Sequence, residues 1–314
     1  MSVTVDPDHT SKSAVAPTVA EAPFNNPKYA DIILRTSNNV DFMVLKSILC
    51  QASPVFETTF SLPQGDTIDS ESLLPVVAVT EDDKVIDTIL RICYPVPNPQ
   101  LDPIILTATL ETGRKYEMSA VTQHGSDSLK ALVDEEPVHA YSIACMFRFK
   151  DQALAAAKSS LRFPIVEILA QSHHLDHLTG QAVSSLVMYH VKCRDVSLSA
   201  VQQVVKPASP AWFWSYQHIS RGGCTAPVNS AYGPAQKWFM DYAAGLTQGF
   251  HERPLLTGPL EFKERMVSAF LMDSTAACMT CLMSAITDIN RFFTALHRTI
   301  QEGHDNVTLE FKST

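Results

Sequence analysis

The segment from Asp31 to Phe60 constrains the fold more than any other part of the chain, because the spacing of its apolar residues changes partway along it. Two β-rich runs, Ile32–Thr36 and Val40–Leu45, are separated by Ser-Asn-Asn. Asparagine tolerates the left-handed backbone that a tight turn requires, so these runs predict a β-hairpin. After the hairpin the apolar residues recur at helical spacing, which predicts two short helices.

The second of these helices has a start signal at Ser53-Pro54. Serine at the N-cap can accept a hydrogen bond from the first turn, and proline suits the first helical position because its fixed φ is already helical. Val55, Phe56 and Phe60 then form one apolar face. We therefore expect Phe56 to point inward and to contact the hairpin.

The remainder of the first third predicts more helices around a small sheet. Val76–Val79 is typical of a short strand, and the helix after it can be capped by Thr80 and ends before Pro95. Two further helices are predicted over Ile104–Met118 and Val121–Val133. So small a sheet must bury one face against helices, which indicates an α+β domain. The expected core residues are Phe42, Val44, Phe56, Phe60, Ile89 and Leu90.

The hairpin–helix segment also carries a recognisable set of motifs. Asp31 precedes the first strand, Asp41-Phe42-Met43-Val44 is followed by Leu45-Lys46, and the second helix starts in Ala52-Ser53-Pro54-Val55-Phe56. In these positions the chain resembles BTB/POZ domains. The stretches LPVVAVTED and ICYPVPNP are most similar to the BTB proteins of basidiomycete (mushroom-type) fungi. Leu45 replaces the usual histidine, near the surface that the family uses for dimers or a pocket.

The resemblance implies a non-catalytic protein–protein interaction protein that self-associates, as a homodimer, and recruits other proteins. The alternative that it implies is a substrate adaptor of a cullin-type ubiquitin ligase. Family members that bind cullins have an apolar residue, any residue and an acid just after the Ser-Pro helix. This chain has Leu62-Pro63-Gln64 there. Gln64 replaces the acid, which argues against the hypothesis of a cullin adaptor.

We expect four regions along the 314 residues. Residues 1–23 are predicted to be a disordered tail, 24–134 a BTB/POZ-like domain, 135–206 a helical extension and 207–314 a C-terminal helical region. The last region begins with a connection rich in Pro, Gly and Trp, and ends in VTLEF, which alternates like a short strand. The predicted fold class is therefore an α+β BTB/POZ-like domain followed by an all-α C-terminal region.

Composition narrows the possible partners and compartment. The formal net charge of −9 argues against a general nucleic-acid surface, which needs clustered Lys and Arg. The longest apolar stretch, residues 269–286, is interrupted by Asp273, so we expect no membrane partner. The N-terminus has no basic start and apolar segment of a signal peptide. Seven cysteines, an odd number, favour reduced thiols in the cytoplasm or nucleus.

Three histidines near the middle of the chain form the first candidate metal cluster. His173 and His177 are four residues apart, which would place both imidazoles on one helix face, and Asp176 could supply a third ligand. His174 lies between them. No glutamate occupies the position where a zinc-protease motif needs its base. We therefore expect a solvated surface cluster in preference to a metal site.

The second candidate is the pair Cys278 and Cys281, spaced as in zinc and dithiol redox sites. Both are predicted to lie in the middle of a long helix, residues 259–301, on its apolar face. Zinc would need two more ligands, and only Cys224 and His218 are suitably placed in the preceding irregular segment. We expect inert, buried thiols, with zinc binding as the alternative and redox chemistry third.

Catalytic motifs are absent from the sequence. It contains no G-x-S-x-G, P-loop, G-x-G-x-x-G or H-E-x-x-H. We therefore predict that the protein is not an enzyme and that it has no catalytic residue, no cofactor and no bound metal.

Overall fold

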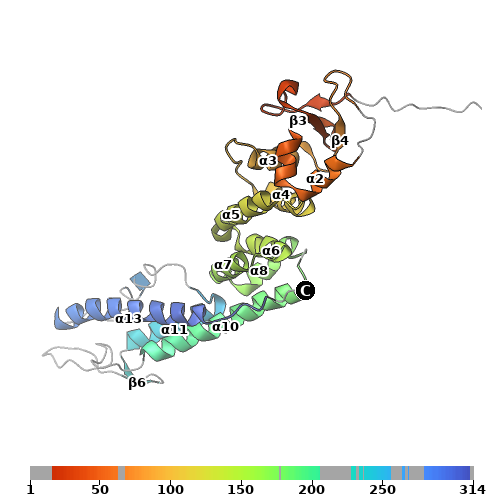
Figure 1. Ribbon diagram of the computed structural model, residues 1–314. Helices are drawn as coiled ribbons and strands as arrows, with labels where there is room; N and C mark the ends of the chain where they lie inside the picture. Colours follow the sequence, from red (N-terminus) through yellow and green to blue (C-terminus); the bar gives the residue numbers. More distant parts are fainter. Residues whose placement is uncertain are drawn as a thin grey trace, which may run out of the picture. The chain divides into compact units, whose positions relative to one another are not determined.

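The computed structural model describes most of the chain (Figure 1). The described residues are 16–62, 68–176, 178–205, 228–230, 233–235, 237–255, 264–265, 268 and 279–311, and those whose side chains are described exclude 172–173, 228–238 and 279–286. The chain divides into two compact units, Met1–Leu129 and Lys130–Thr314. Among the helices in the described ranges, none combines the length and the apolar character needed to cross a bilayer.

The first unit is built on a four-stranded mixed sheet with the strand order β1-β3-β2-β4. The strands are β1 (Thr18–Val19), β2 (Ile32–Arg35), β3 (Val40–Val44) and β4 (Val76–Ala78). Strands β2 and β3 pair antiparallel, which confirms the predicted hairpin. Strand β1 pairs parallel with β3, and β4 pairs parallel with β2.

The two asparagines of the hairpin turn stabilise it in different ways. Asn39 adopts a positive φ of 65°, the left-handed conformation expected at this turn. Asn38 faces the start of the third helix, where its Oδ1 accepts a hydrogen bond from Asp83 N at 3.1 Å and its Nδ2 donates to the Asp83 carboxylate at 2.7 Å. The turn therefore ties the sheet to a helix far along the chain.

The helices of the first unit begin where capping residues allow. They are α1 (Lys46–Ala52), α2 (Pro54–Ser61), α3 (Asp83–Cys93), α4 (Pro103–Lys115) and the start of α5 (Ser119–Glu135), with a 3-10 turn η1 (Pro27–Tyr29). Ser53 Oγ accepts from Phe56 N at 3.1 Å, so the predicted cap of α2 is confirmed. The predicted cap of α3 is wrong: Asp82 accepts from Val85 N at 2.9 Å, because Thr80 lies two residues before the N-cap position.

The core of the first unit lies between the sheet and these helices. Phe56 is buried in this core, and its ring stacks on Tyr116 with centroids 4.4 Å apart. Of the expected core residues only Phe60 is half-buried, packing against the cluster from outside. The cluster includes Phe24, Ile32, Leu34, Phe42, Val44, Leu49, Phe56, Ile86, Ile89, Leu90 and Val121.

The ordered part of the domain starts earlier than the sequence suggests. Strand β1 and the buried Ala20 fall inside residues 1–23, which are predicted to be a tail. Thr18 N donates to Asn39 O at 3.0 Å and Ala20 N to Asp41 O at 2.9 Å. A two-residue strand has no periodicity of its own, so the sequence alone could not reveal it. Residues 1–15 lie outside the described ranges.

The second unit is mostly helical, which confirms the predicted class. Its described elements are α6 (Pro137–Phe147), α7 (Lys150–Ser160), α8 (Ile165–Ala170), α9 (Ser172–Leu175), α10 (Gly180–Val205), α11 (Lys237–Glu252) and α13 (Met279–Asp305), with a small hairpin of β5 (Val228–Ser230) and β6 (Gly233–Ala235). Residues 307–311 form no strand, contrary to the alternation of VTLEF. Val307 N donates to His304 O at 3.1 Å, at the end of α13, and Glu310 Oε1 accepts from Lys192 Nζ of α10 at 3.4 Å.

Helices α10, α11 and α13 form the core of this unit and run side by side (Figure 1). The apolar spacing predicts one helix over Ala182–Lys192 and another over Val196–Val205, but α10 continues through Arg194 and Asp195 without a break. These residues lie on the exposed side while Cys193 is buried, so the charges mark a solvated face and not a helix end. The buried cluster includes Val201, Val205, Phe239, Leu246, Phe250, Ile289, Phe292, Leu296 and Ile300.

Candidate interaction site

The junction between the hairpin and α1 is held by the residues that carry the sequence motif. Leu45, the N-cap residue of α1, has no side-chain cap of its own. Instead the Asp31 carboxylate accepts a hydrogen bond from Lys46 N at 2.7 Å, so an acid at the start of β2 caps α1 from outside. Leu45 N donates to the Tyr94 hydroxyl at 2.8 Å. These two bonds fix the direction in which the helix leaves the sheet.

Leu45 itself, the residue that departs from the resemblance, lies at this junction. Its side chain is half-buried, so the apolar replacement for histidine leaves part of its surface accessible. Its backbone N–H, and not its side chain, makes the bond to the Tyr94 hydroxyl.

Strand β1 forms one of the two edges of the sheet, opposite β4. In the described residues no strand pairs with its outer side. Thr18 N and Ala20 N both bond into β3, and successive N–H groups of a strand point to opposite edges, so Val19 N–H points outward. The Val19 side chain is also 55% exposed. An edge with outward backbone groups and an accessible apolar side chain can pair with another strand.

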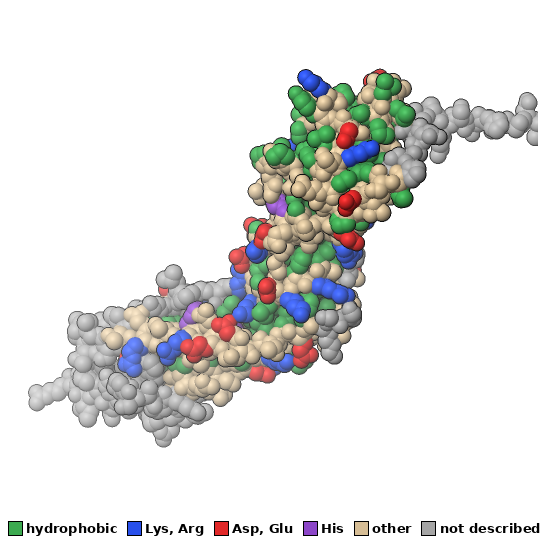
Figure 2. All heavy atoms as spheres, in the orientation of Figure 1, with side chains coloured by type: hydrophobic (Ala, Val, Ile, Leu, Met, Phe, Trp, Pro, Cys, Tyr) green, Lys and Arg blue, Asp and Glu red, His purple; other side chains and the backbone are tan. Residues whose placement is uncertain are grey.

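A second group of exposed apolar side chains follows α2. Leu62, directly after α2, is 60% exposed. Ile68 and Leu73 are also exposed and lie on a turn that is closed by the bridge between Ile68 and Pro75. Hydrophobic side chains are interspersed at the surface of the first unit (Figure 2). The predicted cullin-contact position falls here, but Pro63 and Gln64 lie outside the described residues.

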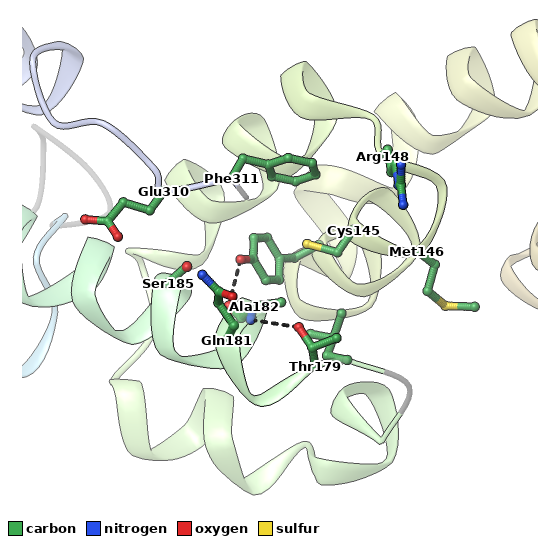
Figure 3. Close-up of a pocket in the computed structure, with 11 residues that line it drawn as sticks. Cys145, Met146, Arg148, Thr179, Gln181, Ala182, Ser185, Glu310 and Phe311 are labelled. Carbon is green, nitrogen blue, oxygen red and sulfur yellow. Dashed lines mark hydrogen bonds between the residues drawn. The ribbon is translucent and has the colours of Figure 1, made fainter. Parts of the chain in front are cut away.

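The second unit contains a pocket of about 230 Å³ between α6, α10 and the C-terminal segment (Figure 3). Tyr141 lines the pocket and donates a hydrogen bond to Ala182 O at 2.9 Å. Cys145, Glu310 and Phe311 also line the pocket (Figure 3). Burial raises the pKa of the Cys145 thiol to about 11, so this thiol stays protonated at neutral pH and is a poor nucleophile.

Of the three histidines singled out by the sequence, only His174 has a described side chain. His177 and the side chain of His173 lie outside the described residues, so the predicted pair stays untested. His174 on α9 stacks on His139 of α6, with ring centroids 4.2 Å apart, and His139 Nδ1 lies 3.0 Å from Glu136 Oε2. Sequence reasoning missed Glu136 and His139, because the only local signal is their three-residue spacing at the start of a helix.

The cysteine hypothesis falls on undescribed parts of the chain. Cys278, Cys224 and His218 lie outside the described residues, and Cys281 is in α13 without a described side chain. Both hypotheses, buried unreactive thiols and zinc binding by the cysteines, therefore stay predictions. Among the described residues, Cys50, Cys93, Cys145 and Cys193 are free thiols.

A small mixed sheet with an accessible edge, packed on a cluster of helices, defines the first unit as an α+β domain. Residues 20–132 match the BTB/POZ domain family. The chain thus carries a BTB/POZ domain, and domains of this family are generally protein–protein interaction modules that commonly self-associate. A comparison with curated proteins finds no match. The predicted fungal origin receives no support from these comparisons.

Proposed function

We propose that the protein is a non-catalytic interaction protein whose BTB/POZ domain forms a homodimer through the open edge of β1. The helical regions, residues 135–206 and 207–314, then recruit partner proteins. The observation that carries this proposal is the outward-pointing Val19 N–H beside the 55% exposed Val19 side chain. This edge offers both a backbone donor and apolar area to a second strand.

A second copy of the same chain suits this edge for a geometric reason. Two identical strands related by a two-fold axis meet antiparallel, and each supplies the donors and acceptors that the other needs. Such an interface extends the sheet across the dimer. Because β1 has only two residues, further contact area must come from the neighbouring surface of each domain.

The test is the mass of the full chain in solution, measured by light scattering at micromolar concentration. We expect a dimer for the native chain and a monomer for Val19→Pro, because proline removes the outward N–H while leaving the inward bonds of Thr18 and Ala20. Val19→Ala is the matched control: it keeps the N–H and should keep the dimer. A monomeric native chain, or a dimer that survives Val19→Pro, would contradict the proposal.

The second candidate function is substrate adaptor of a cullin-type ubiquitin ligase. Its support is Leu62, a large apolar side chain that is exposed directly after α2, where the family's apolar contact residue is expected. Gln64 in place of the acid predicts weak binding. Titration with a purified cullin N-terminal domain tests this: Gln64→Glu should strengthen binding and Leu62→Ala should abolish it. Equal binding by all three chains would count against a cullin contact at this position.

A further inference from the structure

Three side chains with metal-binding atoms converge at the start of α6. Glu136 is the N-cap residue of α6, His139 lies in its first turn, and His174 comes from α9. One ligand atom from each of the three lies within 4.8 Å of the others. We call these three residues the His–Glu cluster. It belongs to the second unit and lies outside residues 20–132, which match the BTB/POZ family.

The backbone around the His–Glu cluster positions its members before any ligand arrives. Glu136 and His139 are three residues apart, a spacing that places both side chains on one face at the helix start. Helices α6 and α9 pack against each other, and His174 N donates to Gln171 O at 3.0 Å within the first turn of α9. The His139 and His174 rings are stacked, 23° from parallel with centroids 4.2 Å apart. A metal lies in the plane of each imidazole that binds it, so one ring must turn about its side-chain torsions and the half-exposed Glu136 carboxylate must rotate to bring the three ligand atoms onto one ion.

The hydrogen bond inside the cluster identifies the proton that a metal would replace. His139 Nδ1 and Glu136 Oε2 lie 3.0 Å apart, so one proton is shared between an imidazole nitrogen and a carboxylate oxygen. A divalent cation would bind both atoms in its place and attract the adjacent His174 ring nitrogen as a third ligand. One carboxylate offsets half of its charge, and the two imidazoles are neutral ligands.

We propose that Glu136, His139 and His174 form a zinc-binding site that clamps α9 onto α6. Two imidazoles with one carboxylate favour a borderline cation such as Zn²⁺ over Mg²⁺ or Ca²⁺, which prefer oxygen ligands. Three protein ligands leave the fourth tetrahedral position for water or for a side chain of a partner protein. The Glu136 side chain is exposed, so the metal can enter from solvent without unfolding the unit.

The experiment uses the full chain without a histidine tag, stripped with chelator and dialysed. Co²⁺ serves as a spectroscopic substitute for Zn²⁺, because its visible d–d absorption appears when it is bound by nitrogen and oxygen ligands in low coordination. We expect one Co²⁺ per chain, displaced by one Zn²⁺. His139→Ala and His174→Ala should each weaken the affinity at least about tenfold, and Glu136→Gln should weaken it less.

Two comparisons keep the result specific. His297→Ala, which alters an exposed histidine on α13, should bind Co²⁺ as the native chain does. Thiolate ligation would add a charge-transfer band in the near ultraviolet that Cys281→Ser abolishes, so a cysteine site would be distinguished from the His–Glu cluster. Circular dichroism must show unchanged helicity in each variant.

The proposal is overturned if the native chain gives no Co²⁺ spectrum, or if the spectrum survives in the double variant H139A/H174A. It is also overturned if the band carries the thiolate signature and depends on Cys281 alone. Loss of the d–d band in the correctly folded histidine variants, with retention in His297→Ala, supports it. These outcomes are independent of dimer formation, so the zinc site and the proposed self-association stand or fall separately.

Discussion

The Asp41 carboxylate receives two hydrogen bonds from the Arg35 guanidinium, Nε to Oδ1 and Nη2 to Oδ2, each 2.7 Å long. The two residues are direct partners in the register of β2 and β3. The Asp41 side chain is only 4% exposed, whereas that of Arg35 is 27% exposed. A buried acid of the hairpin motif is therefore neutralised within the sheet, in the bidentate geometry that makes such pairs strong.

Removing the guanidinium should leave a buried charge without its partner. We expect Arg35→Ala to lower the free energy of unfolding by about 3 kcal/mol. Urea denaturation of the full chain, followed by a probe of the first unit, measures the loss. The exposed pair Arg298 and Glu302, 3.9 Å apart, provides a contrast, because Arg298→Ala should cost less than about 0.5 kcal/mol. Equal losses would mean that the Arg35–Asp41 pair is dispensable.

Phe56→Ala should destabilise the first unit by about 3–5 kcal/mol, as truncation of a buried aromatic ring usually does. Phe56 is 2% exposed and stacks on both Tyr116 and Phe60. Phe60→Ala is the control on the same helix: its ring is only half-buried, so less than half of that loss is expected. A Phe56→Ala loss below about 1 kcal/mol would show that this packing is wrong.

Gly303 of α13 lies directly against Val196 of α10. A Cβ at this position would overlap Val196 Cγ1, whereas a Cβ at Gly245, in α11, would meet nothing within 4 Å. Gly303→Ala should therefore destabilise the second unit by about 1–3 kcal/mol. Gly245→Ala should stabilise it by up to about 1 kcal/mol, because alanine favours the helix. Thermal unfolding of both variants separates the two effects.

A compensating change makes the Gly303 prediction specific. Val196→Ala removes the methyl group that the new Cβ would overlap, so it should restore most of the stability lost in Gly303→Ala. If Val196→Ala adds its own loss in that background with no recovery, the two helices do not meet as described.

The second unit should lose stability as the pH falls, because His190 is buried as the neutral base. His190 is 2% exposed, its Nε2 lies 2.8 Å from Ser160 Oγ, and its Nδ1 has no hydrogen-bond partner. Burial lowers its pKa from 6.5 to about 4. Above pH 6.5 the contribution of neutral His190 to the free energy of unfolding is constant. Between pH 6.5 and pH 4 the unfolded chain binds a proton at this histidine and the folded chain does not, so the free energy of unfolding decreases as the pH falls.

The resulting loss should reach about 2 kcal/mol at pH 5 relative to pH 7. Burial lowers the pKa of His304 as well, so the two histidines act in the same direction. Denaturant titrations across this pH range should give a flatter profile for His190→Gln than for the native chain. His297→Gln, at an exposed position, should leave the profile unchanged. Parallel profiles for all three chains would exclude this role of His190.

The elements that could be predicted from the sequence are those specified by neighbouring residues. The Asn-containing turn, the Ser53-Pro54 helix start and the apolar spacing that buries Phe56 depend on hydrogen bonds and side-chain positions within a few residues. Together they determined the hairpin followed by helices, and through it the BTB/POZ domain. The N-cap of α3 could not be predicted in this way, because Thr80 and Asp82 are both favourable N-cap residues. Only the structure shows that Asp82 caps the helix.

Only the tertiary structure decided which distant segments meet. Strand β1 has too few residues for a periodic signal, and it exists because its backbone bonds to β3. His174 lies with His139 and Glu136 because α9 packs on α6, although sequence spacing alone points to His173 and His177. Local rules describe the backbone within one helical turn, whereas these contacts depend on how separate helices bury their apolar faces against each other.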